Sequence, residues 1–224
     1  MLAIDGPAGS GKSTVAEAVA QRAGFTYIDT GAMYRAAAYR ALQAGLAPGR
    51  DDEAIGELAA GLDFEFRTVA GEARLFVDGE DLSAIIRTPE VSQLSSPVSA
   101  IPAVREHLVA AQRRMAERVP VVMEGRDIGT VVFPDARVKV FLTASAEERA
   151  RRRYEERLAR GEPASYQEIL DEQIERDRRD SSRAVAPLRK AADAAELDSD
   201  GLSAEEVVAE VMKLLKAAGV VADD

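Results

Sequence analysis

Gly6-Pro7-Ala8-Gly9-Ser10-Gly11-Lys12-Ser13-Thr14, close to the beginning of the chain, matches the pattern G-x-x-x-x-G-K-[ST] of a phosphate-binding loop. The apolar run Leu2–Ile4 before it predicts a short buried strand, and Val15–Ala23 after it predicts a helix. Strand, glycine-rich loop and helix therefore follow one another in the order that this loop requires. With average residue frequencies, a chance match in a chain of this length has a probability of roughly 1%. The motif makes a nucleoside triphosphate the first candidate ligand.

The residue types in this loop have physical roles in holding phosphate. The glycines allow backbone N–H groups to turn toward phosphate oxygens, and the N-terminus of the following helix adds roughly half a positive charge. We expect Lys12 to reach the β- and γ-phosphates and the Ser13 hydroxyl to ligate Mg²⁺. The predicted ATP-binding residues are Gly6, Pro7, Ala8, Gly9, Ser10, Gly11, Lys12, Ser13 and Thr14.

The composition excludes several classes of protein. The 224 residues suffice for one substantial core and a small inserted domain, and the absence of cysteine excludes disulfides, a thiolate nucleophile and a cysteine-based zinc site. No apolar run approaches the roughly 20 residues that span a bilayer, and the loop begins too close to Met1 for a signal peptide to precede it. We therefore expect a cytoplasmic protein with no membrane partner. The formal net charge of −10 argues against nucleic acid as the main partner.

Helix and strand patterns alternate along the rest of the chain, as an α/β domain requires. Between Phe64 and Leu82 the apolar period changes to two, with turns at Ala70-Gly71 and Asp78-Gly79. This change predicts antiparallel strands inserted into an otherwise parallel chain. Further strands are predicted at Phe25–Asp29, Pro120–Met123, Val138–Leu142 and Ala195–Leu197, and helices at Gly31–Gly45 and Asp51–Leu62.

Two helix starts carry a recognisable signal. Ser145 and Ser203 are each followed three residues later by a glutamate, Glu148 and Glu206. A serine and a glutamate at this spacing can satisfy each other's backbone N–H groups, so the pattern predicts a capping box at both positions.

The segment Arg149–Arg183 is unusually rich in arginine. One interpretation is a solvated helix face with ion pairs between residues four apart. In a chain with a phosphate-binding loop, the second interpretation is that guanidinium groups converge on a transferring phosphoryl group. We expect some of these arginines to be catalytic, but not all. They are Arg149, Arg151, Arg152, Arg153, Arg157, Arg160, Arg176, Arg178, Arg179 and Arg183.

Two further clusters follow predicted strands. Asp29-Thr30-Gly31-Ala32-Met33-Tyr34-Arg35 opens a helix, so we expect Thr30 to cap it while Tyr34 and Arg35 project from its first turns. Glu124-Gly125-Arg126-Asp127-Ile128-Gly129-Thr130 places a cation and a carboxylate between glycines. Ligands of open α/β folds bind at the carboxyl ends of the strands. Both clusters suit a phosphate-bearing substrate, and a purely structural ion pair is the alternative.

These motifs together resemble the bacterial cytidylate kinase family. The resemblance also includes Glu175-Arg176-Asp177, Asp180 and Arg183-Ala184-Val185-Ala186-Pro187-Leu188, and it runs from about Leu2 to about Leu215. Its most specific parts are Gly125–Thr130 and Arg183–Leu188, because many families share the phosphate-binding loop.

The resemblance implies a fold and an activity. The activity would be transfer of the γ-phosphoryl group of ATP to CMP or dCMP, with Mg²⁺ as cofactor and with nucleotides as the only partners of a monomer. The fold would be one P-loop kinase domain over residues 1–224, a P-loop NTPase three-layer α/β/α architecture with a parallel five-stranded sheet. A nucleoside-monophosphate-binding insertion at about 63–95 would contain the antiparallel strands, and a short lid would lie at about 149–162.

The resemblance also implies roles for individual residues. Arg35 and Arg126 would hold the CMP phosphate. Ser96, Arg105 and Asp127 would read the cytosine edge. The implied substrate-binding residues are Thr30, Tyr34, Arg35, Ser96, Arg105, Arg126, Asp127, Arg176, Asp180 and Arg183. The implied catalytic residues are Lys12, Arg126, Asp127, Arg151, Arg153 and Arg176, with Arg152 as a further lid arginine that could close over the phosphates.

Three alternatives remain open at this stage. The nearest is a kinase of the same architecture that acts on UMP, AMP or a small metabolite. A GTP-binding switch also begins with a phosphate-binding loop, but it needs an Asn-Lys-x-Asp element, and this chain contains no asparagine. An RNA-binding protein that uses the arginine clusters conflicts with the acidic total and the low aromatic content.

Overall fold

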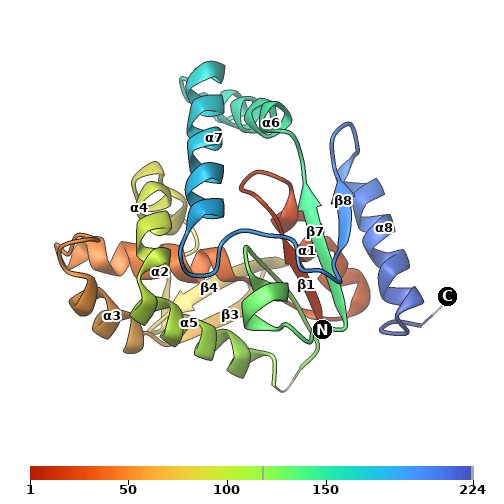
Figure 1. Ribbon diagram of the computed structural model, residues 1–224, viewed down its shortest axis with the longest axis horizontal. Coiled ribbons are helices and arrows are strands. Elements are labelled where there is room, and N and C mark those ends of the chain that lie inside the picture. Colours follow the sequence, from red (N-terminus) through yellow and green to blue (C-terminus); the bar gives the residue numbers. More distant parts are fainter. Residues whose placement is uncertain (118, 223–224) are drawn as a thin grey trace. The chain divides into compact units, whose positions relative to one another are not determined.

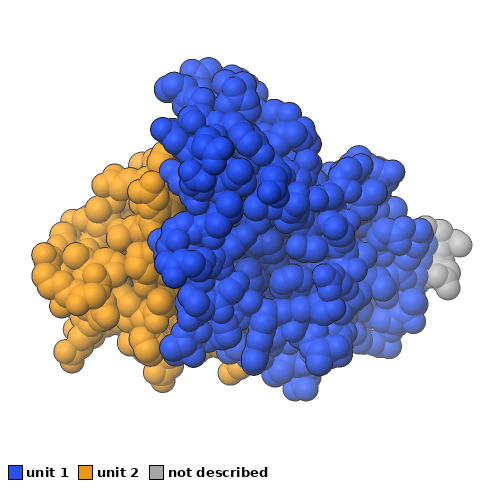
Figure 2. All heavy atoms as spheres, turned by 45° about the horizontal axis from the view of Figure 1, so that its top comes forward, with its two compact units in different colours: residues 1–26, 121–224 blue, residues 27–120 orange. Residues whose placement is uncertain are grey.

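The computed structural model describes residues 1–117 and 119–222, and it consists of two compact units (Figure 1, Figure 2). Unit 1 comprises Met1–Thr26 and Val121–Asp224, whereas unit 2 comprises Tyr27–Pro120. Unit 2 is therefore inserted into the sequence of unit 1. The insertion predicted at about 63–95 lies within unit 2, which extends beyond it on both sides. Among the described residues, no helix has both the length and the apolar character needed to cross a membrane.

The larger sheet has five strands in the order β2-β6-β1-β7-β8. The strand β1 pairs in parallel with β6 and β7, and β7 pairs in parallel with β8. All residues of β1 are buried, as is typical of a parallel sheet that is covered on both faces. The predicted parallel five-stranded sheet is confirmed. Its strands are β1 (Leu2–Asp5), β2 (Thr26–Asp29), β6 (Val121–Gly125), β7 (Val138–Thr143) and β8 (Ala195–Asp198).

The helices of unit 1 form two groups. Helix α1 (Lys12–Ala23) packs against β6 and against α8 (Ala204–Ala217), whereas α6 (Ala146–Ala159) packs against α7 (Tyr166–Ser182), at the top of Figure 1. The arginine-rich segment is therefore two helices, which the turn at Gly161 separates. A π-helical turn, η2 (Ile128–Val132), directly follows the Gly125-Arg126-Asp127 motif.

The two predicted capping boxes differ in the structure. At α8 the Ser203 side chain accepts from the Glu206 backbone, and the Glu206 side chain accepts from the Ser203 backbone, so the box is complete. At α6 Ser145 accepts from the Glu148 backbone at 3.2 Å, but the Glu148 carboxylate binds Arg151 and Arg152. The arginines that follow in the helix compete for this carboxylate, because a charged donor makes the stronger hydrogen bond.

Unit 2 contains the antiparallel strands that the period-two pattern predicted. The strands β3 (Phe64–Val69), β4 (Glu72–Val77) and β5 (Glu80–Asp81) form a three-stranded antiparallel sheet. Both connections have two residues, and both residues of each have positive φ, with values of 52° and 85° at Ala70-Gly71 and 52° and 82° at Asp78-Gly79. This backbone is typical of tight hairpins, in which glycine removes the strain of positive φ.

The helices of unit 2 enclose an apolar core. Helix α2 contributes an alanine-rich face, and these small side chains allow α4 to pack closely against it. Helix α3 packs against α5 in the same way, and at Gly56 of α3 an added Cβ would lie only 2.6 Å from the Ala103 Cβ. The helices are α2 (Thr30–Gln43), α3 (Asp52–Ala60), α4 (Pro89–Ala100) and α5 (Pro102–Met115), with a 3-10 turn η1 (Ile85–Arg87) before α4.

The N-terminus of α2 differs from the prediction. Asp29, rather than Thr30, is the capping residue, and its side chain accepts a hydrogen bond from the Ala32 backbone at 2.8 Å. Thr30 is already the first residue of the helix and is buried. Aspartate and threonine both cap helices well, so the sequence pattern alone did not distinguish the two neighbours.

Candidate functional site

The phosphate-binding loop connects β1 to α1 and needs its glycines for steric reasons. Gly6 has φ 153°, and a Cβ at this position would lie 1.9 Å from the carbonyl oxygen of Leu142. Gly11 is the N-cap residue of α1 in the left-handed conformation, with φ 88°. The loop can therefore pass close to β7 and direct backbone N–H groups toward an anion at the N-terminus of α1.

Lys12 is a buried cation at the start of α1, with only 4% of its surface exposed. Its Nζ donates to the carbonyl oxygen of Pro7 at 2.6 Å and lies 3.4 Å from the Ser10 hydroxyl. Burial, together with repulsion from Arg126, lowers the pKa of Lys12 to about 7, although Glu124 and Asp5 oppose this shift. A bound polyphosphate would supply the negative charge that stabilises this ammonium group.

Four predicted acceptor-binding residues of unit 1 form one cluster, namely Arg126, Arg176, Asp180 and Arg183. Arg126, just after β6, donates from Nε to Asp180 Oδ2 at 3.0 Å, although 54 residues separate them in sequence. Arg183 donates from Nε to the backbone oxygen of Asp180 at 3.3 Å, and its NH2 lies 3.6 Å from the Asp180 carboxylate. Burial opposes the ionisation of Asp180, but the charges of Arg126, Arg183 and Arg176 outweigh it and lower its pKa. The cluster holds several cations around one carboxylate.

Asp5 is a further buried carboxylate that sequence reasoning missed. Its two oxygens accept hydrogen bonds from the backbone N–H groups of Ile128 at 2.8 Å and Gly129 at 2.7 Å. Burial raises the pKa of Asp5 to about 6. Asp5 therefore ties the end of β1 to the turn that follows Arg126 and Asp127, and Asp127 is itself buried. The sequence did contain a signal for this residue, because Asp5 is a carboxylate at the end of an apolar strand and directly before the loop.

The structure is compatible with a Mg²⁺ ion that has few protein ligands, with Ser13 as the candidate. Among the described residues, no group of three or more histidine, cysteine, aspartate or glutamate side chains could hold a metal ion. Mg²⁺ commonly keeps several waters and binds substrate phosphates through few protein ligands. The exposed Ser13 hydroxyl at the first turn of α1 is compatible with this mode.

The predicted lid arginines have different environments. Arg151 pairs with Glu148 and Glu155, each at 2.7 Å, and Arg153 pairs with Glu156 at 3.1 Å, so the structure places both among glutamates of their own helix. Arg152 also pairs with Glu148, at 2.8 Å, and in addition it donates to the backbone oxygen of Ser199 at 2.7 Å and to its hydroxyl at 3.1 Å. A Cβ at Gly11 would lie 3.8 Å from the Arg152 NH1, so of these three arginines Arg152 is the one that the structure places beside the phosphate-binding loop.

In unit 2, Arg35 is held against Asp29. The Arg35 NH2 donates to Asp29 Oδ2 at 2.8 Å. A Cβ at Gly31 would lie 3.1 Å from both Arg35 NH1 and Asp29 Oδ1, so this position suits only glycine without a local shift. Among the described residues, the buried Nε of Arg35 has no hydrogen-bond partner.

The remaining predicted residues of unit 2 lie on α2, α4 and α5. The Arg105 guanidinium lies 5.7 Å from the centroid of the Tyr34 ring, a cation–π contact between α5 and α2. The Arg105 NH1 also lies 3.5 Å from the Ser99 backbone oxygen, and Ser99 donates to the Ser96 backbone oxygen at 2.8 Å. Arg105 is buried, so its guanidinium is oriented by these groups.

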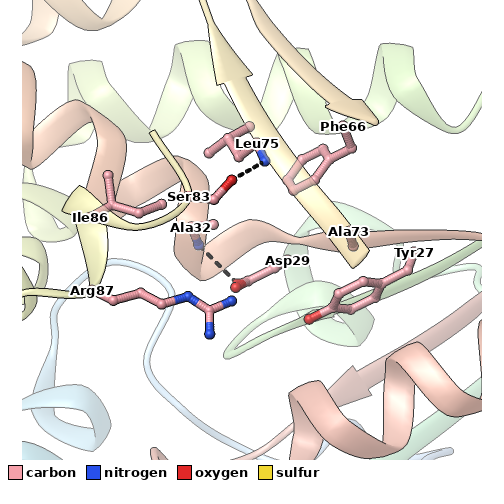
Figure 3. Close-up of a pocket in the computed structure, with 9 residues that line it drawn as sticks. All are labelled: Tyr27, Asp29, Ala32, Phe66, Ala73, Leu75, Ser83, Ile86 and Arg87. Atoms are coloured by element: carbon pink, nitrogen blue, oxygen red, sulfur yellow. Dashed lines mark hydrogen bonds between the residues drawn. The ribbon is translucent and has the colours of Figure 1, made fainter. Parts of the chain in front are cut away.

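A small pocket of about 20 Å³ lies in unit 2 (Figure 3). None of the predicted substrate-binding residues lines it, but Asp29, the partner of Arg35, does. Ser83 in its wall accepts a hydrogen bond from the Leu75 backbone at 2.9 Å. The lining residues are Tyr27, Asp29, Ala32, Phe66, Ala73, Leu75, Ser83, Ile86 and Arg87.

Comparison with known proteins gives consistent matches. The family model for cytidylate kinase matches residues 2–217. A cytidylate kinase of Geobacillus thermodenitrificans (strain NG80-2) is 51% identical over 214 residues, which cover 96% of this chain and 95% of the relative. A cytidylate kinase of Pelotomaculum thermopropionicum is 53% identical over 208 residues, which cover 92% of each chain.

The fold is also similar to that of a solved structure outside this family. A gluconokinase from Sinorhizobium meliloti 1021 superposes with a TM-score of 0.51 at 19% sequence identity, covering 97% of this chain and 93% of that chain. At this low identity the similarity concerns the fold alone. The sequence matches extend over both units and include the loop, the Gly125-Arg126-Asp127 motif and α7. On these grounds the chain belongs to the cytidylate kinase family.

Proposed function

We propose that this protein transfers the γ-phosphoryl group of ATP to CMP and dCMP, giving the corresponding diphosphates. The observation that carries the proposal is the cytidylate kinase family match over residues 2–217. It is supported by unit 1, in which a phosphate-binding loop and a cluster of buried charges have the composition that phosphoryl transfer between two nucleotides requires.

On the donor side, the loop Gly6–Thr14 would bind the ATP phosphates through its backbone N–H groups. Lys12 would approach the β- and γ-phosphates, exchanging its bond to the Pro7 carbonyl for phosphate oxygens. Mg²⁺, held by the Ser13 hydroxyl together with phosphate oxygens, would supply further neutralisation of charge on the transferring group. Arg152, beside Gly11, is a candidate for contact with the donor nucleotide.

On the acceptor side, Arg126 and Arg35 would hold the CMP phosphate, each oriented by a carboxylate, Asp180 and Asp29 respectively. Asp180 would accept hydrogen bonds from ribose hydroxyls, with Arg176 and Arg183 adding positive charge. The buried Arg105, with Ser96 and Asp127, would recognise the cytosine edge, because guanidinium and hydroxyl donors match its carbonyl oxygen and ring nitrogen.

The chemistry demands little of the protein beyond positioning. The attacking oxygen belongs to a phosphate that is already an anion, so no strong general base is required. Catalysis would then rest on alignment of the two nucleotides and on neutralisation of the charge of the transferring group. The lid would exclude water and so limit hydrolysis of ATP.

The assembly and the location of the protein stay predictions. We propose a monomer that acts on free nucleotides, without nucleic acid or membrane as a partner. Light scattering during size-exclusion chromatography tests the monomer, and a mass of twice that of the chain would contradict it. The cytoplasmic location follows only from the sequence arguments above.

The substrate assignment is tested by measuring ADP formation from Mg-ATP with a panel of acceptors. The panel consists of CMP, dCMP, UMP, AMP, GMP, shikimate and gluconate, with a reaction that lacks acceptor as the control. We expect turnover with CMP and dCMP to exceed that with every other acceptor. Faster turnover of another acceptor, or the same rate of hydrolysis without acceptor, would overturn the assignment.

A further inference from the structure

Arg149, the first residue of the arginine-rich segment, is buried, with 4% of its side chain exposed. It lies in the first turns of α6, and its Nε donates to the backbone oxygen of Ala144 at 3.0 Å. Its NH1 donates to the Ala8 backbone oxygen of the phosphate-binding loop at 3.1 Å. Both of its terminal nitrogens donate to the Asp177 carboxylate on α7, at 3.1 and 2.5 Å. One guanidinium group thus contacts the loop, the end of β7 and α7.

The backbone of the loop is packed directly against this group. A Cβ at Gly9, where φ is 79°, would lie 3.3 Å from the Arg149 Cβ and 3.4 Å from Gln173 Nε2 of α7. The Ala8 carbonyl that Arg149 binds belongs to the same peptide group as the Gly9 N–H. Because that peptide is planar, a bond to its oxygen also sets the direction of its N–H. Arg149 therefore helps to orient a backbone donor of the phosphate-binding loop.

Helix α7 connects this contact to the predicted acceptor-binding residues. Asp177 follows Arg176 directly and precedes Asp180 by three residues, so Asp177 and Asp180 lie on neighbouring positions of the helix surface. Asp180 in turn binds Arg126 at 3.0 Å. A displacement of the helix at Asp177 would be transmitted to Asp180 within one turn of rigid helix.

We propose that the buried pair formed by Arg149 and Asp177 is a positioning pair that makes nucleotide binding in the phosphate-binding loop and acceptor binding at α7 interdependent. The acceptor part of this statement rests on the proposed function. The physical basis is that a buried guanidinium with all these bonds has one favourable geometry, so an adjustment of the loop around phosphate is accompanied by an adjustment of α7. Neither residue needs to touch a substrate.

The interdependence can be measured as a ratio of affinities. Calorimetry gives the Kd for CMP with and without a non-hydrolysable ATP analogue, in the unaltered protein and in Asp177→Asn. We expect the analogue to change the Kd about fivefold or more in the unaltered protein and less than twofold in the variant. The substitution retains the size of the side chain but removes its charge. A coupling ratio that is the same in both proteins, or absent from the unaltered protein, would overturn the proposal.

Controls separate positioning from stability. Glu175→Gln alters an exposed carboxylate of the same helix, which pairs with Arg178 at 2.8 Å, and it should keep the full coupling ratio. Arg149→Lys retains a cation but loses the two parallel N–H donors of the guanidinium, so it should reduce the coupling ratio as Asp177→Asn does. Circular dichroism shows whether each variant is folded. If Glu175→Gln also lost the coupling, any change to α7 would have this effect. That outcome would contradict a specific role for the pair of Arg149 and Asp177.

A second readout does not depend on the identity of the acceptor. Hydrogen exchange of the peptide Tyr166–Ser182 is measured with and without the ATP analogue alone. Binding in the loop should slow exchange in α7 of the unaltered protein by about threefold or more, and this protection should disappear in Asp177→Asn. Equal protection in the two proteins would contradict the pair's role. If CMP fails to bind at all, the proposed function fails, while the exchange result still decides the inference.

Discussion

Both units of the molecule bury an apolar core, but they differ in the number of charged side chains that they bury. Unit 1 encloses charged groups around and beside the phosphate-binding loop, whereas the core of unit 2 is made of alanine and larger aliphatic side chains from α2, α3, α4 and α5. Among the described residues, the buried charged side chains of unit 1 are Asp5, Lys12, Glu124, Asp127, Lys139, Arg149 and Asp180, and that of unit 2 is Arg105.

This difference has a physical meaning. Burying a charge requires removing its water, so buried charges give a fold little net stability unless they are paired and hydrogen-bonded. Several buried charges of unit 1 are paired in this way. Asp180 binds Arg126, and Arg149 binds Asp177. Asp5 accepts hydrogen bonds from the backbone N–H groups of Ile128 and Gly129. Among its described residues, unit 2 buries a single charged side chain, Arg105, and its core cluster is apolar. The comparison predicts that changes to the buried charges of unit 1 affect activity, whereas changes to the apolar core of unit 2 affect stability.

The largest effect is expected from removal of the Lys12 charge. Lys12→Met should lower kcat roughly 100-fold or more, because the ammonium group neutralises charge that develops on the transferring phosphoryl group. The melting temperature of the variant should not fall below that of the unaltered protein, since burial already disfavours the charged form of Lys12. Steady-state assays and calorimetry measure both quantities.

The matched control for this prediction is Lys213→Met, which removes an exposed lysine that pairs with Glu210 at 2.7 Å on α8. It should retain full activity. A Lys12→Met enzyme within threefold of the unaltered kcat would break the comparison, because the buried charges of unit 1 would then not serve catalysis.

The apolar core of unit 2 should respond to a cavity. Leu108 on α5 is fully buried in this core, so Leu108→Ala should lower the free energy of unfolding by about 3 kcal/mol. Leu158→Ala, at a leucine of α6 that is 49% exposed, should cost much less. Urea denaturation followed by circular dichroism measures both. Equal losses would show that the core cluster does not dominate the stability of unit 2.

The buried carboxylate of unit 1 should make stability depend on pH. The folded pKa of Asp180 lies below its ordinary value of 3.8, so its ion pairs stabilise the folded state above that value and are lost as the pH falls through the folded pKa. Asp180→Asn should therefore lower the free energy of unfolding by about 2 kcal/mol at pH 7, and this difference should shrink below pH 4. Denaturation at a series of pH values gives the difference.

Asp171→Asn is the control for this effect, because Asp171 is an exposed carboxylate on the same helix. Its stability should follow that of the unaltered protein at every pH. A difference for Asp180→Asn that stays constant down to pH 3 would show that its ion pairs do not stabilise the fold.

The smallest effect is expected at Asp29, the partner of Arg35 in unit 2. Asp29→Asn keeps an oxygen that can cap α2 but loses the charge that orients Arg35. The KM for CMP should rise about fivefold, which corresponds to roughly 1 kcal/mol, while the KM for ATP stays unchanged. Asp52→Asn, at an exposed aspartate that accepts from the Gly49 backbone, should change neither constant. An equal rise in both KM values for Asp29→Asn would indicate a general defect.

Much of the fold could be predicted because its signals are local. The loop pattern predicted a strand and a helix on either side of it, and the period of two between Phe64 and Leu82 predicted the antiparallel sheet of unit 2. The two-residue turn at Asp78-Gly79 was found from glycine beside a residue that tolerates positive φ. Each of these features belongs to one short, continuous stretch of the sequence.

Parts of the candidate site could not be predicted in the same way. Arg149 was grouped with Arg151 and Arg153 because all three lie in one charged segment, yet it is buried against the loop while the other two pair with nearby glutamates. Glu148 was expected to complete a capping box, but it binds arginines instead. Spacing along a helix shows which residues are neighbours on its surface, and it does not show what packs against that surface.

By itself, the sequence determined the phosphate-binding loop, through its glycines, and the antiparallel strands of unit 2, through their apolar period. The parallel five-stranded sheet and the kinase family were implied by the resemblance of several motifs to cytidylate kinases. Only the tertiary structure decided which charges are buried and what they bind. Asp5 contacts the turn at Ile128 and Gly129, and Arg126 contacts Asp180, across separations of 123, 124 and 54 residues. Such pairs form when folding brings distant residues together and removes water from them. A short sequence pattern therefore does not show which charges pair.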